Sequence, residues 1–202
     1  MYLSKVLIPW QKASNPYDIH RELWHLFPRR PDEDRDFLFR VEQKKKDCGV
    51  EVLMQSGQEP GDVDGRNYVE ATRKYEPAIE KGQKLRFRLR ANPVKKISDE
   101  SERLNRKGEV KKCRVPLIRE EEQKAWFERK IEPFCFLDAL IVNQEVPIYF
   151  RKKKSDRTGK IQTVLFDGIF SVKDPSRFMR EIEKGIGPAK AFGCGLLSIA
   201  KP

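Results

Sequence analysis

The sequence is poor in the residues that build metal centres. Its four cysteines are widely separated, with no C-x-x-C pair, and only two histidines, His20 and His25, accompany them. Structural zinc sites draw on closely spaced Cys and His ligands. We therefore expect no metal site and no cofactor, and we expect the thiols to be reduced, as they usually are in the cytoplasm.

Long hydrophobic runs are also missing. No apolar stretch approaches the roughly 20 residues that a membrane-spanning helix needs, and residues 1–10 lack the charged region of a secretory signal. Neither a lipidation signal nor a strongly basic amphipathic helix points to a membrane surface. These absences predict a cytoplasmic protein without a membrane partner.

What the chain has in abundance is positive charge. Its 202 residues include 42 Lys and Arg against 31 Asp and Glu, a formal net charge of +11. The content of 38% apolar residues, with 12 Phe, is nevertheless that of a folded protein. A basic excess of this size favours a polyanionic partner such as a nucleic acid.

Two similar series of elements follow one another along the chain. The first is expected to comprise a strand over 2–9, a helix over 15–27, strands over 36–42 and 50–55, a loop-rich stretch over 57–82 with a short helix from Tyr68, and a strand over 85–91. The second is expected to comprise a basic hairpin around 110–115, a helix over 120–131, strands over 146–151 and 160–172, a helix over 174–184 and a strand over 196–200. Each series approximates β-α-β-β-α-β. The predicted fold class is α+β, with two tandem ferredoxin-like domains over 1–88 and 89–202.

The first helix carries both histidines. Asn15 can cap its free N–H groups, and Pro16 suits the first helical position. Because successive residues turn by about 100°, Tyr17 and His20 lie about 60° apart on one face, whereas His25 is about 140° from His20. On that face His20 can move a proton while Tyr17 orients the same reacting group or donates to it. The alternative from spacing alone is a histidine and aromatic rings that pack at a domain interface.

Residues 185–195 form a glycine-rich loop, with Lys190 among its glycines, that runs into a short apolar strand. Glycine permits positive φ and a close approach of the backbone to a ligand. Several free N–H groups together with a lysine can cradle phosphate oxygens. The candidate phosphate-binding residues are Gly187, Lys190, Gly193 and Gly195. An ordinary turn into the last strand is the alternative.

Three further groups of basic residues are candidates for binding nucleic acid. On the strand over 85–91, the residues that alternate with apolar ones are Arg86, Arg88 and Arg90. The hairpin around 110–115 contributes Lys111, Lys112 and Arg114. The tip that follows residue 151 contributes Lys152, Lys153, Lys154, Arg157 and Lys160. Charged residues are also common on plain solvated faces, and that alternative stays open for the first two groups.

Several stretches, in chain order, are similar to one known family. They are residues 15–20 (NPYDIH), 23–31 (LWHLFPRRP), 36–40 (DFLFR), 85–93 (LRFRLRANP), 112–117 (KCRVPL) and 189–200 (AKAFGCGLLSIA). These motifs resemble the CasE family of CRISPR repeat endoribonucleases, within the RAMP superfamily of CRISPR RNA-processing proteins. The similarity spans nearly the whole chain and fades over 57–82 and 132–158.

The resemblance implies two tandem ferredoxin-like domains and a specific reaction. CasE-like enzymes cleave CRISPR precursor transcripts once, at the 3′ base of the repeat stem-loop. The ribose 2′-OH attacks the adjacent phosphorus, which leaves a 2′,3′-cyclic phosphate and a 5′-OH. The family's catalytic His and Tyr match His20 and Tyr17 here, and no metal is implied because the nucleophile belongs to the substrate.

The resemblance also implies partners. These are the repeat stem-loop RNA, retained after cleavage, and the other subunits of Cascade. The basic groups named above and the glycine-rich loop would hold the RNA, mostly through phosphates and shape, as suits an A-form stem. One alternative is a non-catalytic RNA-binding or scaffold protein of the same fold, with His20 structural. Another is an unrelated basic protein that binds nucleic acid.

Overall fold

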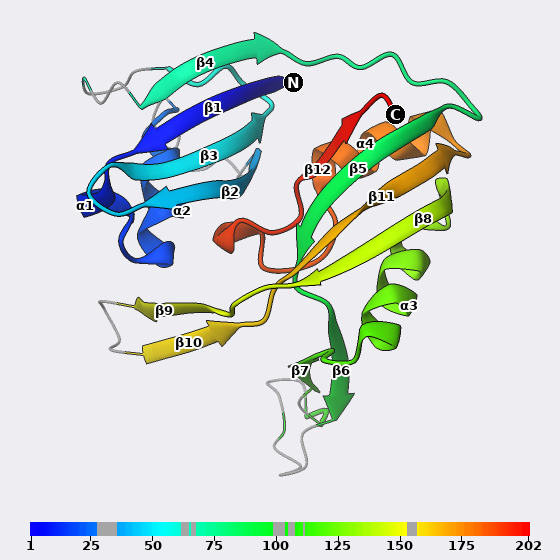
Figure 1. The fold of residues 1–202 in the computed structure, drawn as a ribbon. Coiled ribbons are helices and arrows are strands. Elements are labelled where there is room, and N and C mark those ends of the chain that lie inside the picture. The colour runs from blue at the N-terminus through cyan, green and yellow to red at the C-terminus, as the bar shows by residue number, and fades with distance from the viewer. Residues whose placement is uncertain are drawn as a thin grey trace.

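A computed structural model describes residues 1–27, 36–61, 65, 68–98, 104, 108–110, 112–152 and 157–202, and the side chains of Lys152 and Arg157 are not among the described ones. It consists of two four-stranded antiparallel sheets, one built from residues 2–74 and one from residues 84–200, and two shorter two-stranded sheets (Figure 1). The expected α+β class with two ferredoxin-like domains is confirmed.

The first domain contains β1 (Tyr2–Ile8), α1 (Trp10–Ala13), α2 (Pro16–Trp24), β2 (Phe37–Lys45), β3 (Gly49–Ser56) and β4 (Val69–Lys74). Its strands have the order β2-β3-β1-β4, which is the ferredoxin-like order. The side chains of Ile19 and Leu23 on α2 are fully buried and pack against Val6, Val52 and their neighbours. The sheet therefore holds α2 by one apolar stripe and leaves its other face outside the core.

The expected short helix from Tyr68 is wrong. Residues 69–74 form β4 instead, an edge strand that pairs antiparallel with β1. The backbone oxygen of Tyr68 already accepts a hydrogen bond from Leu7 N at 2.8 Å. The pairing with β1 decides this segment because the alternative, a short isolated helix, is only marginally stable. No helix follows β3 within the described residues 57–61, 65 and 68.

The second domain contains β5 (Lys84–Ala91), α3 (Glu120–Ile131), β8 (Cys135–Gln144), β11 (Val164–Val172), α4 (Pro175–Lys184) and β12 (Leu197–Ala200). The strand order β12-β5-β11-β8 gives the complete β-α-β-β-α-β unit. Both helices cover one face of this sheet (Figure 1). Stacked phenylalanines fill the layer between them, among them Phe87, Phe127, Phe166 and Phe170.

Strand β8 was missing from the expected elements. It is an edge strand, and its pairing with β11 shifts register between Ile169 and Phe170. Apolar residues therefore lie on both of its faces, and Phe136 and Ile141 are 58% and 61% exposed. The alternation that reveals a strand in a sequence is lost under these conditions.

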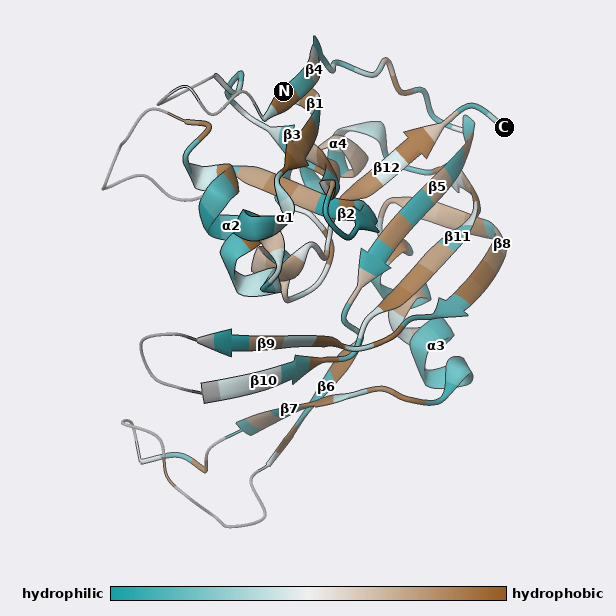
Figure 2. Cartoon of the chain, turned by 60° about the vertical axis from the view of Figure 1, so that its left-hand side comes forward, coloured by the Kyte–Doolittle hydropathy of each residue, from teal (hydrophilic) through white to brown (hydrophobic). Residues whose placement is uncertain are grey.

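Two antiparallel ladders project from the second domain. The pair of β6 (Val94–Ser98) and β7 (Lys112–Pro116) contains the expected basic hairpin segment. The pair of β9 (Ile148–Lys152) and β10 (Arg157–Ile161) reaches back across the first domain and runs below α2 (Figure 2). The strand expected over 160–172 is therefore two strands, interrupted at residues 162–163, because β10 pairs with β9 while β11 pairs with β5 and β8.

The expected domain boundary between residues 88 and 89 falls inside β5. All of β5 pairs within the second sheet, with β11 on one side and β12 on the other. We propose that the domains meet at residues 75–83, the segment without regular structure between β4 and β5. In the described ranges, no helix is long and apolar enough to cross a membrane.

Candidate active site

Helix α2 begins where the sequence predicted. Pro16 is its first residue, and the Asn15 side-chain oxygen accepts a hydrogen bond from Tyr17 N at 3.3 Å. The helix ends at Trp24, three residues before the expected end at Phe27, and a turn follows in which Leu26 and Phe27 are buried. The cap and the buried Ile19 fix the first two turns, and these turns carry Tyr17 and His20.

The His20 ring is half-buried against an aromatic wall. Its ring centroid lies 6.2 Å from that of Trp24, 5.4 Å from that of Phe37 and 6.4 Å from that of Phe39. The wall is built by α2 itself and by β2, both of the first domain. Rings packed on one side restrict the orientation of the imidazole, which is what a proton-transfer group requires.

Tyr17 occupies a different environment one turn earlier. Its side chain is 40% exposed. The ring stacks beside Phe150 of β9 with the centroids 6.5 Å apart, and it lies 6.3 Å from Phe192 of the short 3₁₀ helix η1 (Lys190–Phe192). Tyr17 is therefore placed where α2, the β9–β10 ladder and the glycine-rich loop come together.

The glycine-rich loop, residues 185–195, lies beside both residues. Phe192 of this loop faces Tyr17. A Cβ atom on Gly193 would lie 3.2 Å from Phe39, the same ring that flanks His20. The fold thus brings the helix with His20 and the loop with Lys190 together, although they are about as far apart in sequence as the chain allows.

Glycine is required in this loop by its backbone. Gly187, Gly193 and Gly195 have φ of 82°, 81° and 96°, values that side-chain-bearing residues rarely adopt. The base of the loop is closed by hydrogen bonds from Ile186 N to Gly195 O and from Gly195 N to Arg90 O, at 2.9 and 2.8 Å. The Lys190 ammonium donates to the Lys184 carbonyl at the end of α4, so the loop is also tied to that helix.

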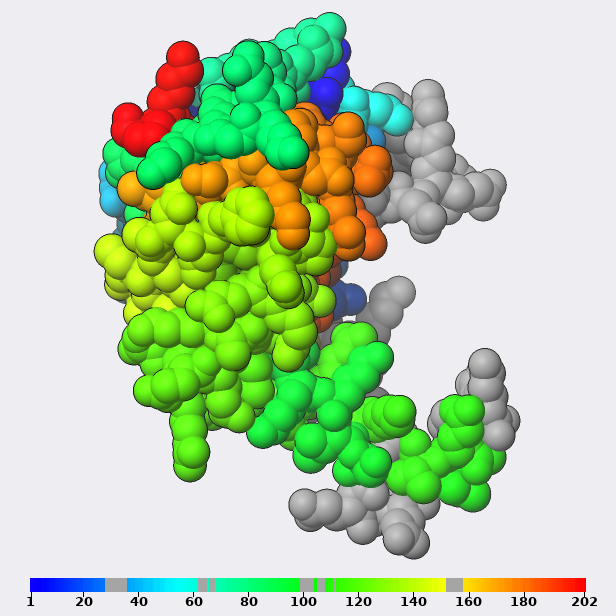
Figure 3. Space-filling model, turned by 90° about the vertical axis from the view of Figure 1, so that its right-hand side faces the viewer, coloured from blue at the N-terminus to red at the C-terminus, as the bar shows by residue number. Residues whose placement is uncertain are grey.

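A cleft of about 400 Å³ continues from this loop, and we call it the basic groove. Its cationic residues are Lys96 and Arg114 of the β6–β7 ladder, Lys130 of α3, and Lys184 and Lys190 beside the glycine-rich loop. Among the described residues that line it, Glu181 is the one carboxylate. In Figure 3 the surface is notched between α4, orange, and the green segments around β6 and β7.

Three of the groove's cations were not predicted from the sequence. Arg114 and Lys190 were expected to bind, but Lys96, Lys130 and Lys184 were not. Lys130 and Lys184 each stand in the last turn of a predicted helix, where a cation is explained by the helix dipole alone. Only the packing of α3 and α4 on one sheet shows that both helix ends face the same cleft.

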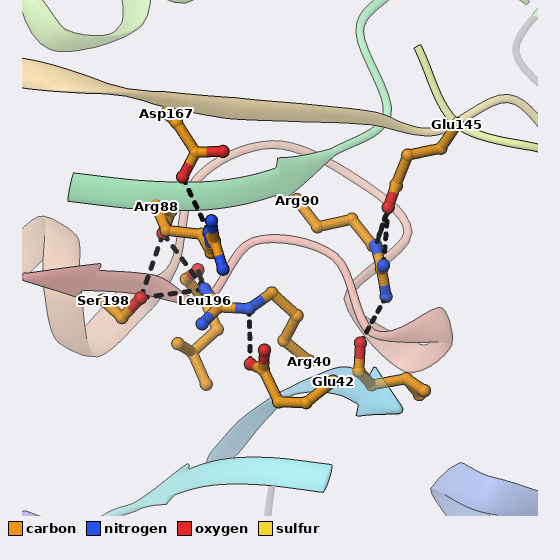
Figure 4. Close-up of polar contacts among 9 residues, drawn as sticks. Arg40, Glu42, Arg88, Arg90, Glu145, Asp167, Leu196 and Ser198 are labelled. Atoms are coloured by element: carbon orange, nitrogen blue, oxygen red, sulfur yellow. Dashed lines mark hydrogen bonds and ion pairs between the residues drawn. The ribbon is translucent and has the colours of Figure 1, made fainter. Parts of the chain in front are cut away.

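The three alternating arginines of β5 have different surroundings. They share the sheet face opposite Leu85, Phe87 and Leu89, as predicted. Arg86 is exposed, whereas Arg88 pairs with Asp167 at 2.7 Å. Arg90 is 19% exposed, forms a bidentate pair with Glu145, and donates to Val41 O at 2.8 Å (Figure 4). The charges of Arg88 and Arg90 are therefore already matched within the protein.

Arg40 of β2 completes what we call the arginine cluster: Arg40, Arg88 and Arg90 with Glu42, Asp167 and Glu145. The Arg40 residue is 4% exposed. Its guanidinium donates to Glu42 at 2.7 Å, to Ser198 Oγ at 2.9 Å and to Arg88 O at 3.1 Å (Figure 4). These contacts join the first sheet to β5 and β12 of the second. Burial lowers the pKa of Arg40, and Glu42 opposes that shift.

Burial also controls the chemistry of the nearby thiol. Cys194, in the glycine-rich loop, is fully buried, and this raises its pKa to about 12. Lys44 is exposed and lines a cleft with Arg90, and desolvation in that cleft together with the Arg90 charge lowers its pKa.

The remaining predicted RNA-binding residues lie on the two ladders. Lys112 is exposed on β7. Lys160 is exposed on β10, with its ammonium 5.8 Å from the Tyr149 ring centroid. Lys111, Lys153 and Lys154 lie outside the described residues, as do the side chains of Lys152 and Arg157. Within the described part of the chain, no three His, Cys, Asp or Glu side chains gather into a group that could hold a metal ion.

A family model described as CRISPR associated protein matches residues 1–201. The chain belongs to this family. The Cascade subunit CasE of Escherichia coli K12 is 45% identical over 200 residues, which is 99% of each chain. The CRISPR-associated endoribonuclease Cse3 of Thermus thermophilus is 35% identical and is matched over 99% of this chain and 100% of its own length.

Solved structures of the family agree with both domains. The crystal structure of Cas6e from E. coli K-12 matches with a TM-score of 0.84 and 43% identity, and the match covers 100% of both chains. A structure of T. thermophilus Cse3 bound to an RNA representing a pre-cleavage complex matches with a TM-score of 0.75 and 32% identity over 98% of each chain. Helix α2, the glycine-rich loop and the basic groove all lie within the matched region.

Proposed function

We propose that this chain is an endoribonuclease that processes CRISPR precursor transcripts within Cascade. It cuts at the 3′ base of the repeat stem-loop, needs no metal ion, and keeps its product. One observation carries this proposal. In a chain similar over its whole length to CasE and Cse3, α2 with Tyr17 and His20 lies against the glycine-rich loop from which the basic groove begins.

The reaction follows from what these residues can do. The 2′-OH before the scissile bond attacks the adjacent phosphorus, and the bond to the next 5′-oxygen breaks, which gives a 2′,3′-cyclic phosphate and a 5′-OH. One proton leaves the 2′-OH and one reaches the 5′-oxygen. We assign one of these transfers to His20, whose ring is oriented by Phe37 and Phe39. Tyr17 positions the reacting group from the same helix face.

The glycine-rich loop and the basic groove supply the remaining requirements. Lys190, a cationic donor, lines the basic groove, and the loop that carries it contacts Tyr17 through Phe192. Such groups stabilise negative charge that develops on phosphoryl oxygens. The groove's cations then hold the stem through its phosphates, as proteins that recognise A-form RNA do. The enzyme works in the cytoplasm, with the transcript and the other Cascade subunits as its partners.

The first test replaces His20 and, as a matched control, His25, the residue that follows the last residue of the same helix. His20→Ala is expected to lower single-turnover cleavage of a repeat stem-loop by about 10²–10⁴-fold while the RNA still binds. His25→Ala is expected to stay close to wild type. Cleavage is expected to persist in excess EDTA and to stop when the cleaved nucleotide carries a 2′-deoxy sugar. A deoxy substrate that is cut, or a strict need for a divalent ion, refutes the mechanism.

A second substrate decides which proton His20 moves. Replacing the 5′-bridging oxygen by sulfur gives a leaving group that departs without protonation. If His20 is the general acid, His20→Ala regains most of the wild-type rate on this substrate. If it is the general base, the loss stays as large as on the oxygen substrate. A wild-type protein that binds the stem-loop tightly and never cuts it favours the alternative, a non-catalytic RNA-binding protein of the same fold.

A further inference from the structure

The side chain of Asn15 makes contacts in two directions. Its oxygen accepts the cap hydrogen bond from Tyr17 N at 3.3 Å, and its nitrogen donates to Arg151 O, on β9, at 2.9 Å. The Arg151 N–H returns to the Asn15 oxygen at 3.5 Å. A carboxamide has the same donor and acceptor as a peptide group. Asn15 therefore pairs with the edge of β9 as a neighbouring strand would, while it also caps α2.

A second contact lies one residue away on β9. Phe150 pairs across the ladder with Gly159 of β10, and a Cβ atom on Gly159 would overlap the end of the Phe150 ring. The Phe150 ring therefore occupies the space that a side chain at position 159 would fill. It reaches Phe192 of the glycine-rich loop, with the centroids 4.4 Å apart, and stacks beside Tyr17.

The β9–β10 ladder needs such support. It is a two-stranded sheet, and an isolated pair of strands is at best marginally stable in water. At its root, Glu145 is fixed by the bidentate pair with Arg90. Towards its far end, the described contacts that fix it to the first domain are those of Asn15 and Phe150. Both of these contacts involve the first turn of α2.

We propose that Asn15, Phe150 and Gly159 form a latch that holds the β9–β10 ladder against the start of α2 and thereby positions Tyr17 for cleavage. Asn15 and Phe150 are positioning residues, since they act through Tyr17. The cleavage part of this proposal rests on the proposed function, whereas the docking of the ladder does not. Through the latch, the orientation of the ladder fixes one wall of the space around the Tyr17 ring.

The competing explanation is that Asn15 serves only as a helix cap, and one substitution separates the two. Ser and Asp cap helices about as well as Asn does. Neither can reproduce the amide that donates to Arg151 O. Asn15→Ser keeps the cap, introduces no charge and removes the latch. Asn15→Asp tests the same loss with a longer side chain, and Phe150→Leu removes the aromatic contact while leaving Asn15 in place.

Hydrogen exchange in the RNA-free protein measures the latch itself. In Asn15→Ser, peptides that cover residues 148–152 and 157–161 are expected to exchange at least about tenfold faster than in wild type, because local opening sets the exchange rate. Peptides from α2 are expected to be unchanged, because the cap remains. Unchanged exchange in the ladder overturns the latch, and equal acceleration in α2 and in the ladder shows that Asn15 is only a cap.

Cleavage measures the consequence. At saturating stem-loop RNA, the single-turnover rate of Asn15→Ser is expected to fall by about 10–100-fold, because small misplacements of reacting groups have effects of this size. The dissociation constant is expected to change less than the rate. Combining Asn15→Ser with Phe150→Leu is expected to lower the rate little further than either change alone, since both open one latch.

The outcomes separate the two parts of the proposal. If hydrogen exchange in the ladder is faster in Asn15→Ser while the cleavage rate stays at the wild-type level, Asn15 does not position Tyr17. In that case the docking of the ladder on α2 through Asn15 still holds. Additive effects of the two substitutions on the rate overturn a shared latch. If wild-type protein does not cleave the RNA at all, the proposed function fails, while the exchange experiment still decides whether the latch exists.

Discussion

The arginine cluster and the basic groove both gather several cations, but in opposite surroundings. In the cluster, Arg40 is buried, and each arginine has a carboxylate partner and, for Arg40 and Arg90, backbone carbonyls of a neighbouring strand. In the groove, Lys96, Lys130 and Lys184 line an open cleft, and within the described ranges no carboxylate lies within ion-pair distance of them. The cluster's positive charge is matched by carboxylates within the protein, and Arg40 and Arg90 also join the two domains through backbone carbonyls.

This difference shows which part of the +11 net charge is available to a partner. A guanidinium presents five donors in a planar fork, which suits the bridging of strands and carboxylates. A lysine ammonium on a flexible stem suits contacts with many phosphates in slightly different places. A count of Lys and Arg cannot separate these uses, because every Lys and every Arg adds the same single charge to that count. Unmatched cations close to the active site are the better guide to the RNA path.

The largest expected effect comes from removing the centre of the arginine cluster. Arg40→Met leaves Glu42 without its cationic partner. It also removes the guanidinium that donates hydrogen bonds to Arg88 O on β5 and to Ser198 on β12. It is expected to lower the free energy of unfolding, measured in urea, by about 3 kcal/mol, as for other broken buried pairs. Arg88→Met is the control, because the Arg88–Asp167 pair is half-exposed and is worth at most about 1 kcal/mol. Equal losses in the two variants would contradict the difference in burial.

A smaller effect is expected from removing the lysines of the basic groove, and the quantity that changes is the affinity for RNA. Changing Lys96, Lys130 and Lys184 together to Gln is expected to flatten the log–log salt dependence of stem-loop affinity by about two units, at roughly 0.7–0.9 per lost phosphate contact. Stability is expected to change little, since these are surface positions. The control removes the same charge elsewhere, at Lys5, Lys74 and Lys81. An equal flattening in the control would mean that net charge, and not the groove, holds the RNA.

The smallest effect is a difference in thiol reactivity. Cys194 lies beside the arginine cluster and Cys135 lies in the core, and burial raises the pKa of each thiol from 9.0 to about 12. At pH 8 only about one molecule in 10⁴ carries either thiolate, and the thiolate is the reactive form. Cys48 is exposed and Cys113, on β7 beside Arg114, is half-exposed.

Two thiols are therefore expected to react with Ellman's reagent at pH 8 in the folded protein, and four after unfolding in guanidinium. The raised pKa of these two thiols also determines how the stability of the fold changes with pH. The unfolded chain ionises these two thiols near pH 9 and the folded chain only near pH 12, so their contribution to stability is full below pH 9 and is lost between the two values. Four fast-reacting thiols in the folded protein would contradict the burial of Cys135 and Cys194.

Much of the local structure could be predicted because local chemistry decides it. Asn15 and Pro16 begin α2, the alternation of residues 85–91 makes β5, and Asp174 caps α4. The positive φ at Gly193 and Gly195 explains why these positions are glycine. The expected pair of ferredoxin-like units also holds, although β4 replaces the expected helix of the first unit and β5 belongs to the second.

Other parts could not be predicted, because distant segments decide them. The hydrogen bonds of β4 with β1 make a strand of a segment that had been expected to be helical. The register shift in the pairing of β8 hides that strand's alternation. Arg90 and Lys130 are equally basic in the sequence, yet packing gives one a carboxylate and the other an open groove.

The sequence by itself determined the overall charge, the start of α2, the shared face of Tyr17 and His20, and the motifs that resemble CasE. Only the tertiary structure decided which cations remain unmatched, that Phe39 and Phe192 bring the glycine-rich loop to His20 and Tyr17, and that Asn15 reaches Arg151. The physical reason is the separation in sequence between the residues that interact. Caps, turns and alternation depend on neighbours in the chain, whereas ion pairs and ring contacts join residues that become neighbours only when two sheets pack together.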